Sequence, residues 1–214
     1  MKFEIHIPTS IEHITLEQYQ KFASIGDDND EDFIAYKMLE IFCGVPNDVA
    51  SQMKWDDVTD ICEQVHAVMN TKTAFTNRFM LNGVEYGFIP SVEDMTFQEF
   101  VHMEEFVREP KNYHKLAQIM FRPISKSYKE LYDIEPYEYS GKRANELKQM
   151  PTSIFAETMV FFYNIANELL IHIQISSKQS ASQDTMQLAN LLQNMVGLTQ
   201  FMPYVKATSR NLNR

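Results

Sequence analysis

Two stretches of this sequence match each other residue by residue. Residues 7–19 read IPTSIEHITLEQY, and residues 89–100 read IPSVEDMTFQEF, which aligns with the first stretch after one deletion. In each, alternating residues lead to a proline that ends a strand, and then to a threonine (Thr15 or Thr96) followed three residues later by glutamine or glutamate, the pattern of a capped helix start. The sequence therefore predicts a strand-turn-helix unit that occurs twice. Internal duplication and independent convergence on good capping chemistry both explain the match.

Outward from these units the apolar residues recur mostly at helical spacing. The period changes at residues 75–81 and 84–89, two short apolar runs separated by Asn82-Gly83, which predicts a β-hairpin with a type I′ turn. If the repeated unit is a duplication, we expect residues 1–7 to join this hairpin in one small sheet. The predicted helices cover about 16–25, 33–43, 56–70, 96–106, 110–122, 142–150, 154–175 and 188–198. The fold class is thus mainly α with a small antiparallel β-sheet (α+β), a helical bundle around one long central helix at 154–175.

The chain has 214 residues, of which 44% are hydrophobic, enough to bury a core. We expect residues 1–178 to form a single helical domain with a small sheet, with possible repeat halves 1–81 and 82–150. Residues 179–214 are predicted to be a polar linker followed by a C-terminal amphipathic arm. Cys43 and Cys62 lie among apolar neighbours, so we expect two buried free thiols and no disulfide framework.

Charge is distributed unevenly along the chain. The net charge is -10, which argues against general affinity for nucleic acid because phosphate binding needs clustered lysine and arginine. Residues 1–70 hold 14 acids and 4 bases, a net of -10, whereas residues 110–214 hold 8 acids and 12 bases, a net of +4. The sequence therefore predicts an acidic end and a mildly basic end.

The C-terminal arm contains the candidate interaction residues. Its apolar side chains recur at helical spacing, and three basic residues follow them with no acid after Asp184. The apolar face docks either on the chain's own core or on a neighbouring subunit. The basic residues either contact nucleic acid or an acidic protein surface, or form a solvated tail. The candidate residues are Leu188, Leu191, Leu192, Met195, Lys206, Arg210 and Arg214.

The sequence contains few patterns that could support catalysis. Glu-x-x-His pairs begin at Glu63 and Glu99, and Glu168 precedes His172 by four residues, which is reminiscent of the ligands of a di-iron helical bundle. A fourth carboxylate is not identifiable, and Glu99 stands in a first helical turn, where acids are favoured anyway. We therefore expect no catalytic residues, no metal and no cofactor, with a di-iron helical enzyme as a remote alternative.

One part of the sequence resembles a family. Residues 82–90 (NGVEYGFIP) and 95–100 (MTFQEF), followed by His114 and by residues 122–124 (RPI), are similar to small structural or assembly proteins of tailed bacteriophages, including crAss-like phages. The resemblance covers residues 82–124 and brings no catalytic motif.

The resemblance implies a location in the virion, after assembly in the cytoplasm of the host bacterium. It implies a multi-copy ring or adaptor protein of the neck, between portal and tail, whose partners are copies of itself and other portal or tail proteins, with no membrane. Nucleic acid would be contacted only by the C-terminal basic residues. The alternative is a tail assembly chaperone that binds another tail protein transiently.

Overall fold

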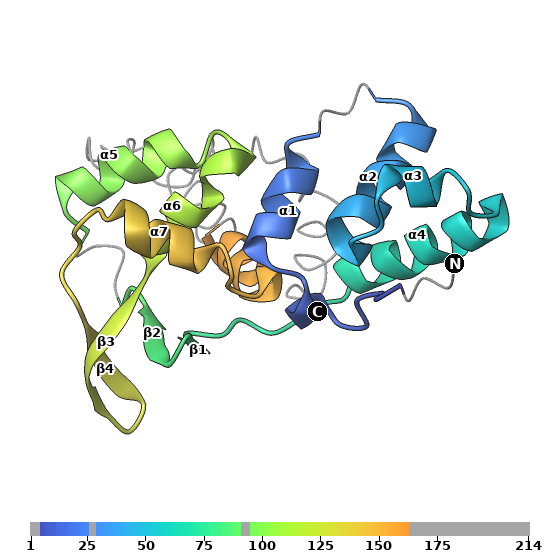
Figure 1. Cartoon of the computed structure of the whole chain (residues 1–214). Coiled ribbons are helices and arrows are strands. Elements are labelled where there is room, and N and C mark those ends of the chain that lie inside the picture. The colour runs from blue at the N-terminus through green and yellow to red at the C-terminus, as the bar shows by residue number, and fades with distance from the viewer. Residues whose placement is uncertain (1–4, 26–28, 91–94, 163–214) are drawn as a thin grey trace, which may run out of the picture.

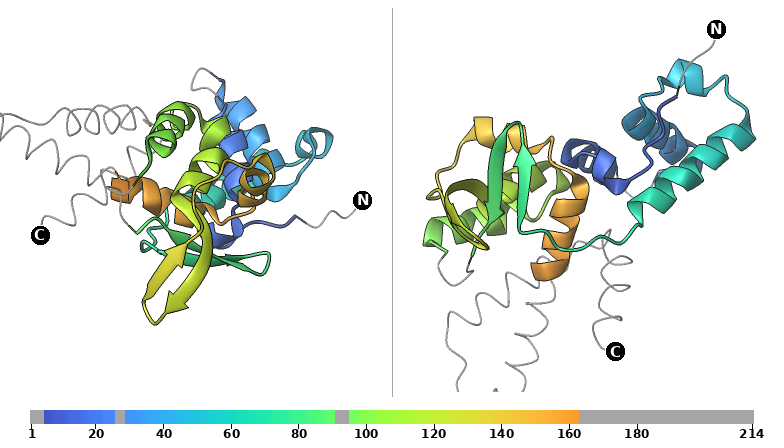
Figure 2. Two further views of the ribbon diagram at one scale, coloured as in Figure 1. Left: turned by 90° about the vertical axis from the view of Figure 1, so that its left-hand side faces the viewer. Right: turned by 90° about the horizontal axis from the view of Figure 1, so that it is seen from below.

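The computed structural model describes residues 5–25, 29–90 and 95–162 (Figures 1 and 2). Its helical elements are η1 (Ile11–His13), α1 (Leu16–Ala23), α2 (Glu31–Cys43), α3 (Asn47–Ala50), α4 (Trp55–Met69), α5 (Phe97–Phe106), η2 (Pro110–Asn112), α6 (Tyr113–Met120) and α7 (Gly141–Leu147), and residues 152–162 are also helical. The strands are β1 (Arg78–Leu81), β2 (Val84–Phe88), β3 (Phe121–Tyr128) and β4 (Leu131–Ile134). The predicted class, mainly α with a small antiparallel sheet, is confirmed. None of the described helices is both long and apolar enough to cross a bilayer.

Helices α1 and α5 begin with the capping boxes that the sequence predicts. The Thr15 backbone N–H donates to Gln18 Oε1 (3.0 Å), while Thr15 Oγ1 accepts from the Gln18 N–H (3.2 Å). The Thr96 N–H likewise donates to Glu99 Oε2 (2.6 Å). Each box satisfies backbone donors that a helix start otherwise leaves unpaired.

The rest of the repeated unit is less alike in its two places. Residues 5–7 form no strand, so the prediction that they join the sheet is wrong for these residues. The first helical residue of α1, Leu16, is fully buried, whereas its counterpart in α5, Phe97, is 83% exposed. The two similar local sequences thus lie in different environments. The duplication of the unit stays a prediction.

The sheet is antiparallel with the order β1-β2-β3-β4. The predicted hairpin is confirmed, because Asn82 (φ +50°) and Gly83 (φ +78°) both adopt the left-handed conformation of a type I′ turn. The second hairpin, β3–β4, corrects the predicted helix over residues 110–122, whose last residues belong to a strand. Helix α6 ends at Met120, and β3 runs through Pro123, whose partner on β2 is Tyr86.

The buried apolar side chains form two clusters. The larger one joins the sheet to α1, α5, α6, α7 and residues 152–162, with Tyr113, Phe121 and Phe155 almost fully buried. The smaller one joins α2, α3 and α4 around Leu39 and Val65. Figure 1 shows α1 between the two groups. Residues 154–162 are the described part of the helix predicted over 154–175, and their largely buried side chains fit a core position. Residues 163–175 lie outside the described residues.

Tyr132 fastens the β3–β4 hairpin to the rest of the sheet. Its ring lies over Gly87 of β2, its hydroxyl donates to the Phe88 carbonyl (2.8 Å), and the guanidinium of Arg78 lies 4.5 Å from the ring centroid. Arg78 also donates to Ser127 Oγ (3.0 Å). The hairpin is therefore held close to its turn, where Tyr132 pairs with Ser127, by contacts to both β1 and β2.

Adding one methyl group at Gly87 should weaken this anchor. A Cβ at Gly87 would lie 2.8 Å from Tyr132 Cδ2 and closer still to Cε2, so the ring must move and its hydrogen bond to Phe88 is disturbed. We expect Gly87→Ala to lower the free energy of unfolding by about 1–3 kcal/mol, measured by urea denaturation. The same substitution should cost much less in a Tyr132→Ala background. If the two substitutions lower the free energy of unfolding by strictly additive amounts, Tyr132 does not anchor the hairpin through Gly87.

Candidate interaction surfaces

A buried charge cluster is the first candidate for a functional site. Glu99 Oε1 lies 2.9 Å from Arg122 Nη1, and the two side chains are 2% and 12% exposed. Burial lowers the pKa of Arg122, and the neighbouring Glu99 carboxylate opposes that shift. Glu99 Oε2 closes the capping box of α5, and its Oε1 joins α5 to β3 through Arg122. We assign this pair to the scaffold.

Next to this pair, His102 Nδ1 lies 2.7 Å from the hydroxyl of Tyr137. Burial raises the pKa of Tyr137 to about 12, so the phenol stays protonated at neutral pH. The contact joins α5 to the segment between β4 and α7. A neutral phenol against an imidazole is a packing contact and supplies no nucleophile.

The Glu-x-x-His pairs are not brought together. Glu63 and His66 are exposed on α4, whereas the pair that begins at Glu99 lies on α5, in the other apolar cluster. Within the described residues, no three metal-ligating side chains gather at one point. Glu168 and His172 lie outside the described residues.

The two cysteines differ in burial. Cys43 is buried, as predicted, whereas Cys62 is only half-buried, which corrects the expectation of two buried thiols. Burial, and then the neighbouring Cys62, raises the pKa of Cys43 to about 11. Burial also raises the pKa of Cys62. Both thiols therefore stay protonated near neutral pH and are poor nucleophiles.

A hollow with a volume of about 520 Å³ lies between α1, α2, η2 and the end of α7. Four lysines line it, but three of them already form ion pairs: Lys21 with Glu17, Lys37 with Glu40, and Lys111 with Glu109. Mutual neutralisation leaves little net charge to bind an anion.

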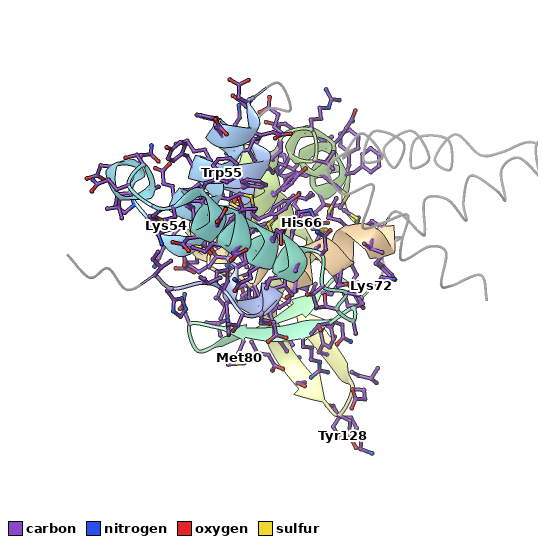
Figure 3. The ribbon with its side chains drawn as sticks, turned by 90° about the vertical axis from the view of Figure 1, so that its right-hand side faces the viewer. Lys54, Trp55, His66, Lys72, Met80 and Tyr128 are labelled. Atoms are coloured by element: carbon purple, nitrogen blue, oxygen red, sulfur yellow. The ribbon has the colours of Figure 1, made fainter. Side chains whose placement is uncertain are left out.

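The tip of the β3–β4 hairpin exposes two large apolar side chains. Tyr128 and Leu131 flank the two-residue turn and are 71% and 75% exposed. Figure 1 shows the hairpin extending from the body of the molecule, and Figure 3 shows Tyr128 at its end. The turn residue Lys129 has φ +54°, which a lysine rarely adopts. An anchored hairpin with an apolar tip is suited to contact another protein.

A groove between α2, α3 and α4 is the second exposed apolar surface. It has a volume of about 300 Å³ and is lined by Asp32, Ala35, Tyr36, Ala50, Ser51, Met53, Trp55 and Val58. Trp55 is 65% exposed at the start of α4, where Figure 3 shows it on the surface. The helical spacing of the apolar residues in α2 predicts a buried face that includes Phe33, Tyr36, Met38, Leu39 and Phe42. The prediction is confirmed for Met38, Leu39 and Phe42 and is wrong for Phe33 and Tyr36, which are exposed.

The surroundings of this groove are strongly acidic. Residues 30–63 hold nine acids and two bases, a net charge of -7. Asp32 lines the groove itself, and Asp56 and Asp57 follow Trp55 directly, all three exposed. Sequence reasoning found the acidic end of the chain but overlooked Trp55, although it is the only tryptophan and lies beside two aspartates.

The candidate residues of the C-terminal arm lie outside the described residues. These are Leu188, Leu191, Leu192, Met195, Lys206, Arg210 and Arg214.

Comparison of the chain with protein-family models, with curated proteins and with solved structures found no match.

Proposed function

We propose that this chain is a non-enzymatic structural protein of a tailed bacteriophage virion, a multi-copy ring or adaptor component of the neck between portal and tail. The exposed apolar tip of the β3–β4 hairpin is the observation that carries the proposal. Tyr128 and Leu131 expose 71% and 75% of their surface at the end of a projecting element. Apolar and aromatic side chains in such positions are typical of the centre of a protein–protein interface.

The anchoring of the hairpin supports the same function. Because Tyr132 and Arg78 fix the residues next to its turn against β1 and β2, little conformational freedom remains to be lost when its tip meets a partner. A ring protein needs such fixed contact points, since the geometry of one interface sets the closure of the whole ring.

The phage assignment is supported by the resemblance of residues 82–124. These residues form β2, α5, α6 and the start of β3, and they include Gly87 under the Tyr132 ring and the Glu99–Arg122 pair. Their roles here are packing and capping. Because the resembling residues belong to the scaffold, the resemblance supports an architecture shared with the phage proteins. We propose the virion location on that basis.

The other proposal is a tail assembly chaperone. A chaperone also needs exposed apolar surface, and the hairpin tip and the groove would serve it equally well. The two functions differ in one respect: a ring protein stays in the finished particle in several copies, whereas a chaperone leaves.

Polar substitution of the hairpin tip tests the interaction directly. We expect the double variant Tyr128→Ser/Leu131→Ser to keep its free energy of unfolding within about 0.5 kcal/mol of wild type, because both side chains are exposed. Its self-association, followed by native mass spectrometry over a concentration series, should weaken at least about tenfold.

A matched control is Met80→Ser/Val84→Ser, which removes exposed apolar side chains from the other hairpin. We expect this control to associate like wild type. Equal association of the wild-type chain and the tip variant would contradict the proposed role of the tip.

A further inference from the structure

We infer that residues 186–214 of one copy dock in the acidic groove between α2, α3 and α4 of a second copy. The inference rests on the proposed function, because it requires copies of the chain to associate with one another. It names a specific contact for the arm, whose apolar face is predicted to dock either on its own core or on a neighbour.

The apolar chemistry of the two partners is complementary. The groove offers Trp55 and Tyr36 at its surface, with Met53 and Val58 half-buried beside them. A hollow of about 300 Å³ takes a few side chains and not a whole helix. The predicted arm helix presents a single apolar face, whose residues Leu188, Leu191, Leu192 and Met195 recur at the spacing that helix-in-groove recognition uses.

The charges of the two partners are also complementary. The stretch that forms the groove carries a net charge of -7, whereas residues 186–214 carry three bases and no acid. Asp56 and Asp57 beside Trp55 are exposed and available to Lys206 and Arg210 once the apolar face is seated. Opposite charge steers the two surfaces together and fixes the orientation of the arm.

The length of the chain beyond the described residues permits a contact between copies. Residues 163–187 separate Phe162 from Leu188, the first apolar residue of the predicted arm helix. Even as a random coil, a segment of this length has a root-mean-square span of about 28 Å, and more when extended. The arm can therefore reach a neighbouring molecule, and tethering raises the effective concentration of each further contact in a ring.

Trp55 reports directly on the groove because it is the only tryptophan of the chain. In the full chain at concentrations where it associates, we expect blue-shifted emission and protection from acrylamide quenching. Dilution to the monomer should expose the indole. The variant Leu191→Asp/Leu192→Asp should leave Trp55 exposed at every concentration, with a quenching constant raised at least threefold over that of the associated wild type.

The matched control is Asn190→Asp/Gln193→Asp, which adds the same charge on the opposite face of the predicted helix. We expect it to protect Trp55 like wild type. In a second experiment, Asp56→Lys/Asp57→Lys should expose Trp55 at low ionic strength, and adding Lys206→Glu/Arg210→Glu should restore protection. Protection of Trp55 is restored only if the side chains at positions 56 and 57 interact with those at positions 206 and 210.

Three results would overturn the inference. If the chain associates while Trp55 stays accessible, the groove is not the docking site, although the proposed function stands. If Trp55 is protected in a chain that is monomeric at every concentration, the arm docks on its own groove and not on a second copy. A monomer with accessible Trp55 contradicts both the inference and self-association.

Discussion

Replacing Arg122 with alanine is expected to lower the free energy of unfolding by about 3–5 kcal/mol, because a buried carboxylate is left without its counter-charge. Glu99 is 2% exposed, and its Oε1 lies 2.9 Å from Arg122 Nη1. The other carboxylate oxygen accepts the Thr96 N–H, so Glu99 cannot turn away from the interior without opening the helix cap. Urea or thermal denaturation of the two proteins measures the difference.

An exposed ion pair provides the control for this substitution. Arg108 and Glu104 are 2.8 Å apart on α5, with 61% and 40% of their side chains exposed. Arg108→Ala should cost no more than about 1 kcal/mol, since water screens such a pair. The double variant Glu99→Gln/Arg122→Met keeps the cap, removes both charges and should be more stable than Arg122→Ala. Similar costs for Arg122→Ala and Arg108→Ala would show that Glu99 and Arg122 are not a buried pair.

Acidification is expected to destabilise the chain through His114 by about 3 kcal/mol between pH 6.5 and pH 4. His114 is 8% exposed, and its Nδ1 lies 3.0 Å from Gln20 Nε2. Burial lowers its pKa from 6.5 to about 4; Lys148 and Lys115 add to the shift, and Glu17 opposes it. The unfolded chain therefore binds a proton at a higher pH than the folded chain. The stability is complete above pH 6.5 and is lost as the pH falls through the folded pKa.

His114→Asn isolates this contribution, because the amide keeps an acceptor for Gln20 and does not titrate. Carboxylates titrate in the same range in both proteins, so the difference between them is the informative quantity. The wild type should lose about 3 kcal/mol more than the variant between pH 6.5 and pH 4, measured by denaturation at each pH. Parallel stability curves for the two proteins would show that His114 is not buried in its neutral form.

Local sequence chemistry predicts much of this fold. The capping boxes at Thr15 and Thr96 form because the cap and its acceptor lie three residues apart, so no distant contact is needed. The Asn82-Gly83 turn likewise needs only two residues that tolerate positive φ. These elements follow from interactions within one turn of chain.

The β3–β4 hairpin was missed for a physical reason. Its turn is built from Lys129 and Glu130, neither of which favours a tight turn, and residues 125–131 are all exposed, so no alternation of apolar and polar side chains is present. The hairpin is held by Tyr132 against Gly87, 45 positions apart in sequence. A contact of that separation leaves no periodic signal.

The candidate surfaces were predicted only in part. Charge counting identified the acidic end of the chain, which contains the groove. The exposure of Trp55 and Tyr36 depends on how α2, α3 and α4 pack, since an aromatic residue at helical spacing is buried only if another element covers it. Helical spacing therefore predicts Tyr36 in the core and gives no signal for the exposed Trp55.

The number of copies in the finished particle tests the central claim most directly. Quantitative mass spectrometry of purified virions, calibrated against the portal protein, gives this number. A ring or adaptor protein of the neck predicts a constant ratio corresponding to several copies per particle. Absence of the chain from purified virions would contradict this account and favour an assembly chaperone.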